Sequence, residues 1–238
     1  MMTGGVHNLS HELSWHEDDQ PFSEQFGDHF YSRADGRGET GHVFIGGNRL
    51  PGRWAGVENF TIGELGFGTG LNFLETWRVW KATRQIGQTL TFVSFEGFPL
   101  EGDQIERAIS RWPELAPLTA RLLEFWPRLS GEPNDWALDS QTRLRLVRAD
   151  ALTGLANWND AAHAWYLDGF SPARNPDMWS PELMCAVYGQ TVSGGTIASY
   201  TVAGWVRRNL QSAGFDVCKE PGFAGKREML CGVKPRAL

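Results

Sequence analysis

Apolar runs alternate with amphipathic stretches along the chain from residue 60 onward. Five runs rich in β-branched and aromatic residues predict buried strands, namely residues 60–65, 90–96, 144–147, 164–168 and 195–200. The stretches between them have helical spacing and cover residues 72–84, two patterns within 99–126, residues 181–188 and residues 203–212. A closing pair of runs, residues 215–219 and 228–233, resembles a hairpin. This order predicts an α/β fold whose seven-stranded sheet is mostly parallel, with an antiparallel last strand.

The N-terminal part of the chain does not follow that alternation. Residues 1–20 are polar and lack periodicity, so we predict no regular structure there. Residues 42–45 are mostly apolar and precede a Gly-Gly-Asn turn, which predicts a short strand. We therefore divide the chain into an N-terminal extension, residues 1–59, that packs on a core domain, residues 60–238.

Three glycines at every second position separate the first predicted strand from the first predicted helix. They form the motif Glu-x-Gly-x-Gly-x-Gly over residues 64–70. Glycine permits positive φ and lets a ligand approach the backbone without a Cβ in the way. The spacing differs from the Gly-x-Gly-x-x-Gly of dinucleotide folds. It is similar to the first motif of Rossmann-like S-adenosyl-L-methionine methyltransferases, whose cofactor carries a cationic methionine end. The alternative is a glycine-rich turn without a ligand. We therefore predict a cofactor-binding loop that consists of Glu64, Gly66, Gly68, Gly70 and Asn72.

Four acidic residues lie at the ends of four successive predicted strands: Glu64, Glu96, Asp150 and Asp168. In a doubly wound sheet the ligand crevice lies beyond the carboxyl ends of the strands, so these carboxylates should meet there. We expect Glu64 to face a cation, Glu96 to bind a ribose diol and Asp150 to lie near an adenine amino group. A nicotinamide fold would also place an acid after the second strand. An NAD-dependent oxidoreductase is therefore an alternative, which the glycine spacing disfavours.

The loop after the fourth predicted strand is stiffer than a simple connection needs. It reads Asp168-Gly-Phe170-Ser-Pro172 and continues to Trp179 with a second proline and two Asx residues. An Asp followed by an aromatic residue and a proline resembles the fourth motif of amine-directed methyltransferases, where the acid holds the nitrogen and the ring supports a planar substrate. Only a neutral amine has the lone pair that takes a methyl group, and an alkylamine with a pKa near ~10 is mostly protonated in neutral water. We predict Asp168 and Phe170 as catalytic residues, with Asp168 accepting the amine proton. Alternatively, Asp168 only caps a turn or a helix.

The charge and the cysteine content of the chain bear on which partners, metals and cell compartments are compatible with it. The formal net charge is −6, which argues mildly against nucleic acid as a partner. Residues 201–238 hold seven basic and three acidic side chains, however, and both a basic face for phosphate and a solvated terminus fit that excess. Three widely spaced cysteines suit neither a disulfide framework nor a zinc site. No apolar run approaches the ~18 residues of a membrane helix, and the first residues lack the features of a signal peptide. We expect a cytoplasmic protein without a metal.

Several blocks of sequence carry a more specific resemblance. They are residues 64–73, 167–179 and 225–229, with further matching segments at residues 21–26 and 39–44. On these blocks the chain resembles the MnmC-type tRNA methyltransferases. The resemblance implies a Rossmann-like class I fold and S-adenosyl-L-methionine as cofactor. It also implies tRNA as partner, with methylation of 5-aminomethyl(-2-thio)uridine at the wobble position of the anticodon to the 5-methylaminomethyl form.

The predicted substrate side combines residues from three parts of the chain: Tyr31, Pro172, Trp179, Lys226 and Arg227. Tyr31 is a polar residue of the extension, and Pro172 belongs to the Asp168 loop. Trp179 offers a surface on which an anticodon base can stack. Lys226 and Arg227 either hold a phosphate or lower the pKa of the substrate amine.

Two alternative functions share the predicted fold. A methyltransferase of a small-molecule amine is favoured by the acidic net charge. A non-catalytic cofactor-binding module is disfavoured by intact acids at all four strand ends. In many members of the resembled family this domain is fused to an FAD-dependent oxidase that removes a carboxymethyl group. Since the chain ends at Leu238, we expect it to carry the methyltransferase domain alone.

Overall fold

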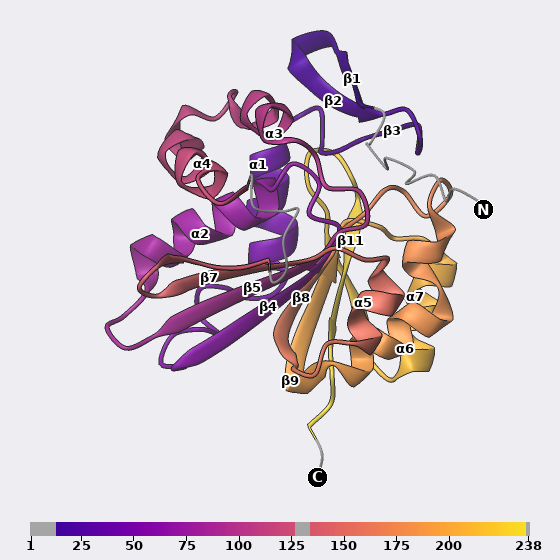
Figure 1. The fold of residues 1–238 in the computed structure, drawn as a ribbon. Coiled ribbons are helices and arrows are strands. Elements are labelled where there is room, and N and C mark those ends of the chain that lie inside the picture. The colour runs from indigo at the N-terminus through magenta and orange to yellow at the C-terminus, as the bar shows by residue number, and fades with distance from the viewer. Residues whose placement is uncertain (1–12, 127–133, 237–238) are drawn as a thin grey trace, which may run out of the picture.

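The computed structural model describes residues 13–126 and 134–236, and a twisted sheet runs through its centre (Figure 1). Eight strands form this sheet in the order β10-β11-β9-β8-β4-β5-β7-β6. They are β4 Asn59–Leu65, β5 Thr89–Phe95, β6 Asp135–Asp139, β7 Thr142–Val147, β8 Ala162–Leu167, β9 Thr191–Ser199, β10 Asp216–Pro221 and β11 Glu228–Val233. The five central strands are parallel, whereas β11 is antiparallel to both β9 and β10. The predicted α/β class and the closing hairpin are confirmed.

The sheet has eight strands rather than the predicted seven because β6 pairs antiparallel with β7 at one edge. Only Trp136 and Leu138 of this strand are buried. Two apolar positions are too few to show a period of two, so the sequence pattern did not reveal the strand.

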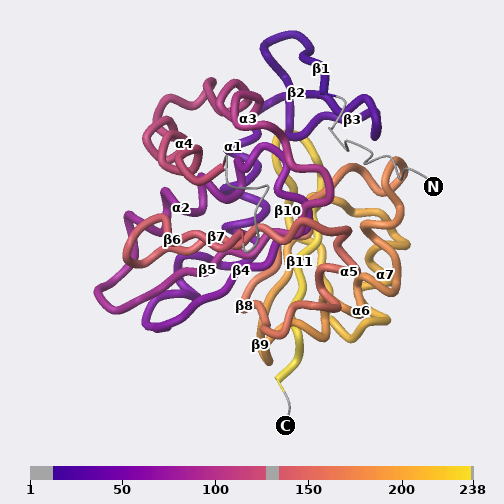
Figure 2. Tube along the Cα trace, viewed as in Figure 1, coloured from indigo at the N-terminus to yellow at the C-terminus, as the bar shows by residue number. Residues whose placement is uncertain are grey.

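Helices cover both faces of the sheet (Figures 1 and 2). One side carries α1 Gly36–Glu39, the π-helix η2 Thr40–Gly46, α2 Leu71–Thr83, α3 Gly102–Ile109, the 3₁₀-helix η3 Pro113–Leu115 and α4 Ala116–Leu123. The other side carries α5 Ala151–Ala156, the 3₁₀-helix η5 Pro176–Trp179, α6 Pro181–Gly189 and α7 Gly204–Ala213. Successive residues of β5 enter separate hydrophobic clusters, Phe92 in one and Val93 in the other. This two-sided burial explains why the central strands are continuous apolar runs.

The N-terminal extension contains more regular structure than the sequence predicted. β1 Leu13–His16, β2 Gln20–Ser23 and β3 Asp28–His29 form a separate antiparallel sheet, and the 3₁₀-helix η1 Glu17–Asp19 joins the first two strands. The prediction of irregular structure is therefore wrong for residues 13–20. Residues 1–12 lie outside the described part of the chain.

Residues 42–45, predicted as a strand, lie inside η2. The helical segment begins after Asp35, whose side chain accepts a hydrogen bond from the Gly38 amide. Its buried residues are Gly36, Glu39, Thr40, Val43, Phe44 and Ile45, and the first five have helical spacing. Three of these six residues are polar or lack a side chain, and the three apolar ones are consecutive, so the apolar pattern resembled a short strand.

Asn48 ties the extension to the core, and its loss is expected to be costly. Its side-chain amide donates to the carbonyls of Phe44 and Trp165 and accepts from the Thr196 hydroxyl, all in the interior. Asn48→Ala should lower the free energy of unfolding by about 3 kcal/mol, because these buried partners lose their hydrogen bonds. Urea denaturation measures this. The exposed Asn157→Ala should change stability by about 0.5 kcal/mol, and an equal effect of the two variants would contradict the prediction.

Tyr31, Val43 and Phe44 of the extension belong to the same hydrophobic cluster as β4, β5 and α2. The division of the chain into residues 1–59 and 60–238 stays a prediction. Within the described ranges, none of the helices has the length and apolar character that crossing a bilayer requires.

Candidate active site

The sheet register aligns the carboxyl ends of four parallel strands. Leu65 of β4 lies opposite both Phe95 of β5 and Leu167 of β8, and Phe95 lies opposite Val147 of β7. The loops that follow these strands therefore meet at one edge of the sheet, as the doubly wound topology requires. A cavity of about 1000 Å³ opens at this edge, large enough for a nucleoside cofactor together with part of a substrate.

The glycine turn between β4 and α2 forms the floor of one part of this cavity. Gly66, Gly68 and Gly70 have φ values of 85°, 52° and 75°, a region that favours glycine. Gly66 and Gly68 line the cavity, and a Cβ on Gly68 would lie 3.2 Å from the Phe30 ring. Gly70 is the N-cap of α2 and is not among the cavity-lining residues, so it shapes the turn.

Glu96 and Asp150 both line the cavity, as predicted from their positions after β5 and β7. The Glu96 carboxylate accepts hydrogen bonds from the amides of Gly68 at 3.0 Å and Phe98 at 2.7 Å. Each of its oxygens keeps a lone pair for a ribose hydroxyl. Asp150 is exposed and caps α5 by accepting from the Thr153 amide. Hydrogen bonds from the side chain and the amide of Thr153 hold the pKa of Asp150 below its usual range. Its carboxylate is thus charged, and it both caps α5 and lines the cavity.

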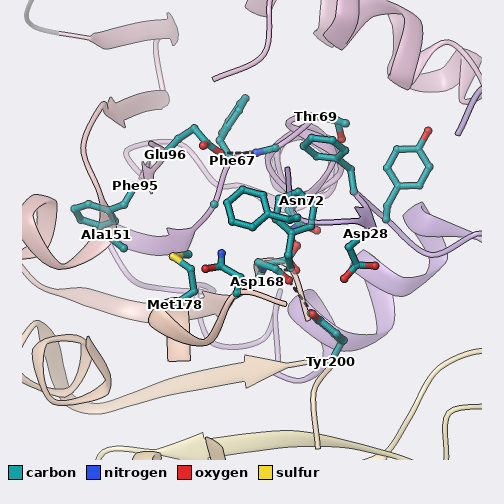
Figure 3. A pocket seen from close by; sticks show the side chains of 18 of the residues that line it. Asp28, Phe67, Thr69, Asn72, Phe95, Glu96, Ala151, Asp168, Met178 and Tyr200 are labelled. Atoms are coloured by element: carbon teal, nitrogen blue, oxygen red, sulfur yellow. Dashed lines mark hydrogen bonds between the residues drawn. The ribbon is translucent and has the colours of Figure 1, made fainter. Parts of the chain in front are cut away.

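Asp168 lies at the centre of the cavity, next to Asn72 (Figure 3). Its Oδ2 accepts from Asn72 Nδ2 at 2.7 Å, and its Oδ1 accepts from the Gly169 amide at 2.9 Å. Burial raises the pKa of Asp168 to about 7, and the hydrogen bonds from Gly169 and Asn72 oppose that rise. Asn72, predicted for the cofactor loop, therefore binds the predicted catalytic carboxylate.

Glu64 does not face the cavity, contrary to prediction. Its side chain is fully buried beneath the site, where one carboxyl oxygen accepts from the Ser94 hydroxyl at 2.7 Å. The other oxygen has no hydrogen-bond partner among the described residues. Burial raises the pKa of Glu64 well above its usual range, and the charge of Asp168 raises it further.

Two predicted substrate contacts are buried by the fold. Trp179 is 1% exposed, and its indole donates to the Phe170 carbonyl, so it cannot stack on a base. Tyr31 lines the cavity, but its hydroxyl donates to the Ala108 carbonyl, and burial raises the pKa of Tyr31 to about 12.

Of the other three residues predicted to contact the substrate, one lines the cavity and two do not. Pro172 is buried and Arg227 is exposed, and neither is among the cavity-lining residues. Lys226 does line the cavity, where its ammonium forms a 2.6 Å ion pair with Glu39. Glu39 belongs to α1, so the β10–β11 loop and the extension meet at this point.

An aromatic wall stands beside Asp168. Phe170 stacks on Phe26, with 4.7 Å between ring centroids, and meets Phe30 edge-on at 5.2 Å. Tyr200 completes this side and donates its hydroxyl to the Gly169 carbonyl at 2.8 Å. Sequence analysis missed Phe26, Phe30 and Tyr200 as site residues. The aromatic residues spaced along the extension were the available signal for Phe26 and Phe30.

The cavity is strongly acidic. Its lining includes seven carboxylates and two basic groups: Asp28, Glu39, Glu96, Asp150, Asp168, Asp177 and Glu182, with Arg33 and Lys226. Such a lining complements a cation and opposes phosphate. No cluster of three metal-binding side chains occurs among the described residues. A positive-φ glycine turn held by the carboxylate after β5, in an acidic cavity, suits a cationic nucleoside cofactor.

Parallel-sheet topology and this site together define a Rossmann-like methyltransferase. The family described as S-adenosyl-L-methionine-dependent methyltransferase matches residues 113–235, just over half of the chain. The chain belongs to this family, and S-adenosyl-L-methionine is its cofactor.

Two curated proteins match nearly the whole chain and give a more specific comparison than the family model. The tRNA 5-methylaminomethyl-2-thiouridine biosynthesis bifunctional protein MnmC of Chromohalobacter salexigens is 46% identical over 227 residues, 93% of this chain and 32% of that protein. The protein of the same name from Pseudomonas aeruginosa is 44% identical over 228 residues, 93% and 35% respectively. The chain thus spans about a third of the length of these curated relatives. The crystal structure of MNMC2 from Aquifex aeolicus shares the fold, with a TM-score of 0.76 and 21% identity over 98% of this chain and 73% of that one.

Cofactor binding is expected to depend on pH through Asp168. Because the pKa of this carboxyl is raised to about 7, raising the pH through that value adds a negative charge to the cavity in which we expect the cofactor sulfonium to lie. Affinity for S-adenosyl-L-methionine should therefore rise about threefold across this range. S-adenosyl-L-homocysteine, whose sulfur is uncharged, serves as control and should show a smaller change. Titration calorimetry measures both, and equal pH dependence of the two ligands would contradict the prediction.

Proposed function

We propose that the chain methylates the primary amine of 5-aminomethyl(-2-thio)uridine at the wobble position of tRNA anticodons, in the cytoplasm. The observation that carries the proposal is Asp168, a carboxylate held by two hydrogen bonds beside an aromatic wall and the glycine turn. The substrate would be a primary alkylamine on a planar base, which needs a proton acceptor and an aromatic surface. The names of the relatives support this choice of substrate.

The roles of the side chains follow from their positions. S-adenosyl-L-methionine, when bound, supplies an electrophilic methyl group on a sulfonium. Gly66, Gly68 and Glu96 would hold its ribose and methionine portions, and Asp150 would lie at its adenine edge. Asp168 would accept the proton of the substrate ammonium and direct the nitrogen lone pair, since a pKa of about 7 is suited to a base near neutral pH. Phe170 would flank the base. Such positioning offers effective molarities of ~10⁵ M or more.

The acidic cavity lining also supports a second function, methylation of a small-molecule amine. A small cationic amine would bind this lining without needing a phosphate-binding surface. Steep salt dependence of the KM for tRNA would favour the first function, because phosphate contacts release counterions.

The test is nucleoside mass spectrometry of tRNA that carries 5-aminomethyl-2-thiouridine, after incubation with the protein and S-adenosyl-L-methionine. The expected product carries one added methyl group, a net gain of one CH₂, on that nucleoside and on no other. The free nucleoside and simple alkylamines are assayed in parallel. Equal kcat/KM on free amine and on tRNA would overturn the proposal in favour of the small-molecule function.

A further inference from the structure

Two side chains, those of Thr40 and Asn72, connect the N-terminal extension to Asp168. The Thr40 hydroxyl of η2 donates to Asn72 Oδ1 at 2.7 Å, and Asn72 Nδ2 of α2 donates to Asp168 Oδ2 at 2.7 Å. Thr40 is 2% exposed and Asn72 is 8% exposed, so water competes little for these hydrogen bonds. Both residues line the cavity.

The orientation of the Asn72 amide decides whether a hydrogen-bond donor or an acceptor faces the Asp168 carboxylate. A primary amide has a donor nitrogen and an acceptor oxygen of nearly equal size, and a half-turn of the side chain exchanges them. In the observed orientation the nitrogen donates to the carboxylate. The reverse orientation would place the amide oxygen against a carboxylate oxygen, and only a protonated carboxyl could bind it. Because the Thr40 hydroxyl donates its proton to Asn72 Oδ1, it favours the observed orientation, in which the amide nitrogen faces Asp168.

We propose that Thr40 is a positioning residue: its hydroxyl fixes the Asn72 amide with the NH₂ group toward Asp168, and so keeps this carboxylate able to accept the substrate proton. The inference rests on the proposed function only where it gives Asp168 that proton-accepting role. Thr40 Oγ1 also lies 3.2 Å from the Gly36 carbonyl, an intrahelical contact that is longer than the one to Asn72.

The charges around Asp168 explain why a fixed donor matters. Glu39 of α1 raises the pKa of Asp168, and Lys226 of the β10–β11 loop lowers it. Glu64 of β4 lies beneath, close enough for Asp168 to raise its pKa. Tyr200, at the end of β9, is in turn affected by the charges of Asp168, Glu39 and Asp28 of β3. Carboxyl groups outnumber the single ammonium here, so the ionised form of Asp168 depends on the donors Gly169 and Asn72.

The test compares Thr40→Val, which removes the hydroxyl at nearly constant shape, with Thr40→Ser, which keeps it. Thr40→Ala removes the same hydroxyl should valine not be accommodated. Asp168 is titrated by carboxyl NMR in protein bound to S-adenosyl-L-homocysteine, and methyl transfer to tRNA is measured against pH. Thr40→Val should raise the titration midpoint by about one unit and lower kcat at neutral pH about fivefold. Thr40→Ser should restore both quantities.

Thr119→Val is the matched control. The buried Thr119 hydroxyl of α4 donates to the Leu115 carbonyl of η3, so this variant removes a similar group away from the site. If Thr40→Val moves the Asp168 midpoint no more than Thr119→Val does, the inference is overturned. Failure of the wild-type chain to methylate tRNA would instead overturn the proposed function. In that case the Asp168 titration, which needs no substrate, still decides the role of Thr40.

Discussion

Asp168→Asn is expected to lower the rate of methyl transfer about 10³-fold, because asparagine cannot accept the proton of the substrate ammonium. Affinity for S-adenosyl-L-methionine should fall only about threefold, as the charge beside the sulfonium is lost. The pH dependence of cofactor binding should disappear in the same variant. Single-turnover methylation and titration calorimetry measure these quantities separately.

The control for this variant lies at the opposite end of the same strand. Asp160 precedes β8, is exposed, and accepts a hydrogen bond from the Ala161 amide. Asp160→Asn makes the same chemical change away from the cavity and should leave methyl transfer unaltered. If Asp168→Asn retains a rate within about tenfold of the wild type, Asp168 is not the proton acceptor.

Glu96→Ala should weaken binding of S-adenosyl-L-methionine about 100-fold. The carboxylate accepts from the Gly68 amide, so its removal releases the glycine turn as well as the expected ribose contacts. Two hydrogen bonds to a charged group contribute about 3 kcal/mol together, which corresponds to that loss of affinity. Calorimetry measures the dissociation constant, with Glu106→Ala on the exposed face of α3 as control. A change within about fivefold would assign Glu96 to the turn alone.

Sequence alone determined the order of the core elements and the edge of the sheet at which the site forms. Strand and helix patterns are local, and the carboxyl ends of parallel strands necessarily share one edge. The glycine motif and the acids Glu96, Asp150 and Asp168 were therefore placed at the cavity without knowledge of any long-range contact. The edge strand β6 was missed because it offers too few apolar positions to show its period. The helix η2 was predicted as a strand because its buried apolar residues, Val43, Phe44 and Ile45, are consecutive.

Only the tertiary structure decided what each polar side chain contacts, since those contacts join residues distant in sequence. Glu64 accepts a hydrogen bond from Ser94 and is not among the residues that line the cavity. Asn72, adjacent to the glycine motif, donates to Asp168, which lies 96 positions further along the chain. Trp179 packs beneath its own loop, whereas Phe26 of the extension stacks on Phe170. Periodicity predicts which residues are buried or lie at strand ends. The direction of a side chain and its hydrogen-bond partner follow from how the elements pack.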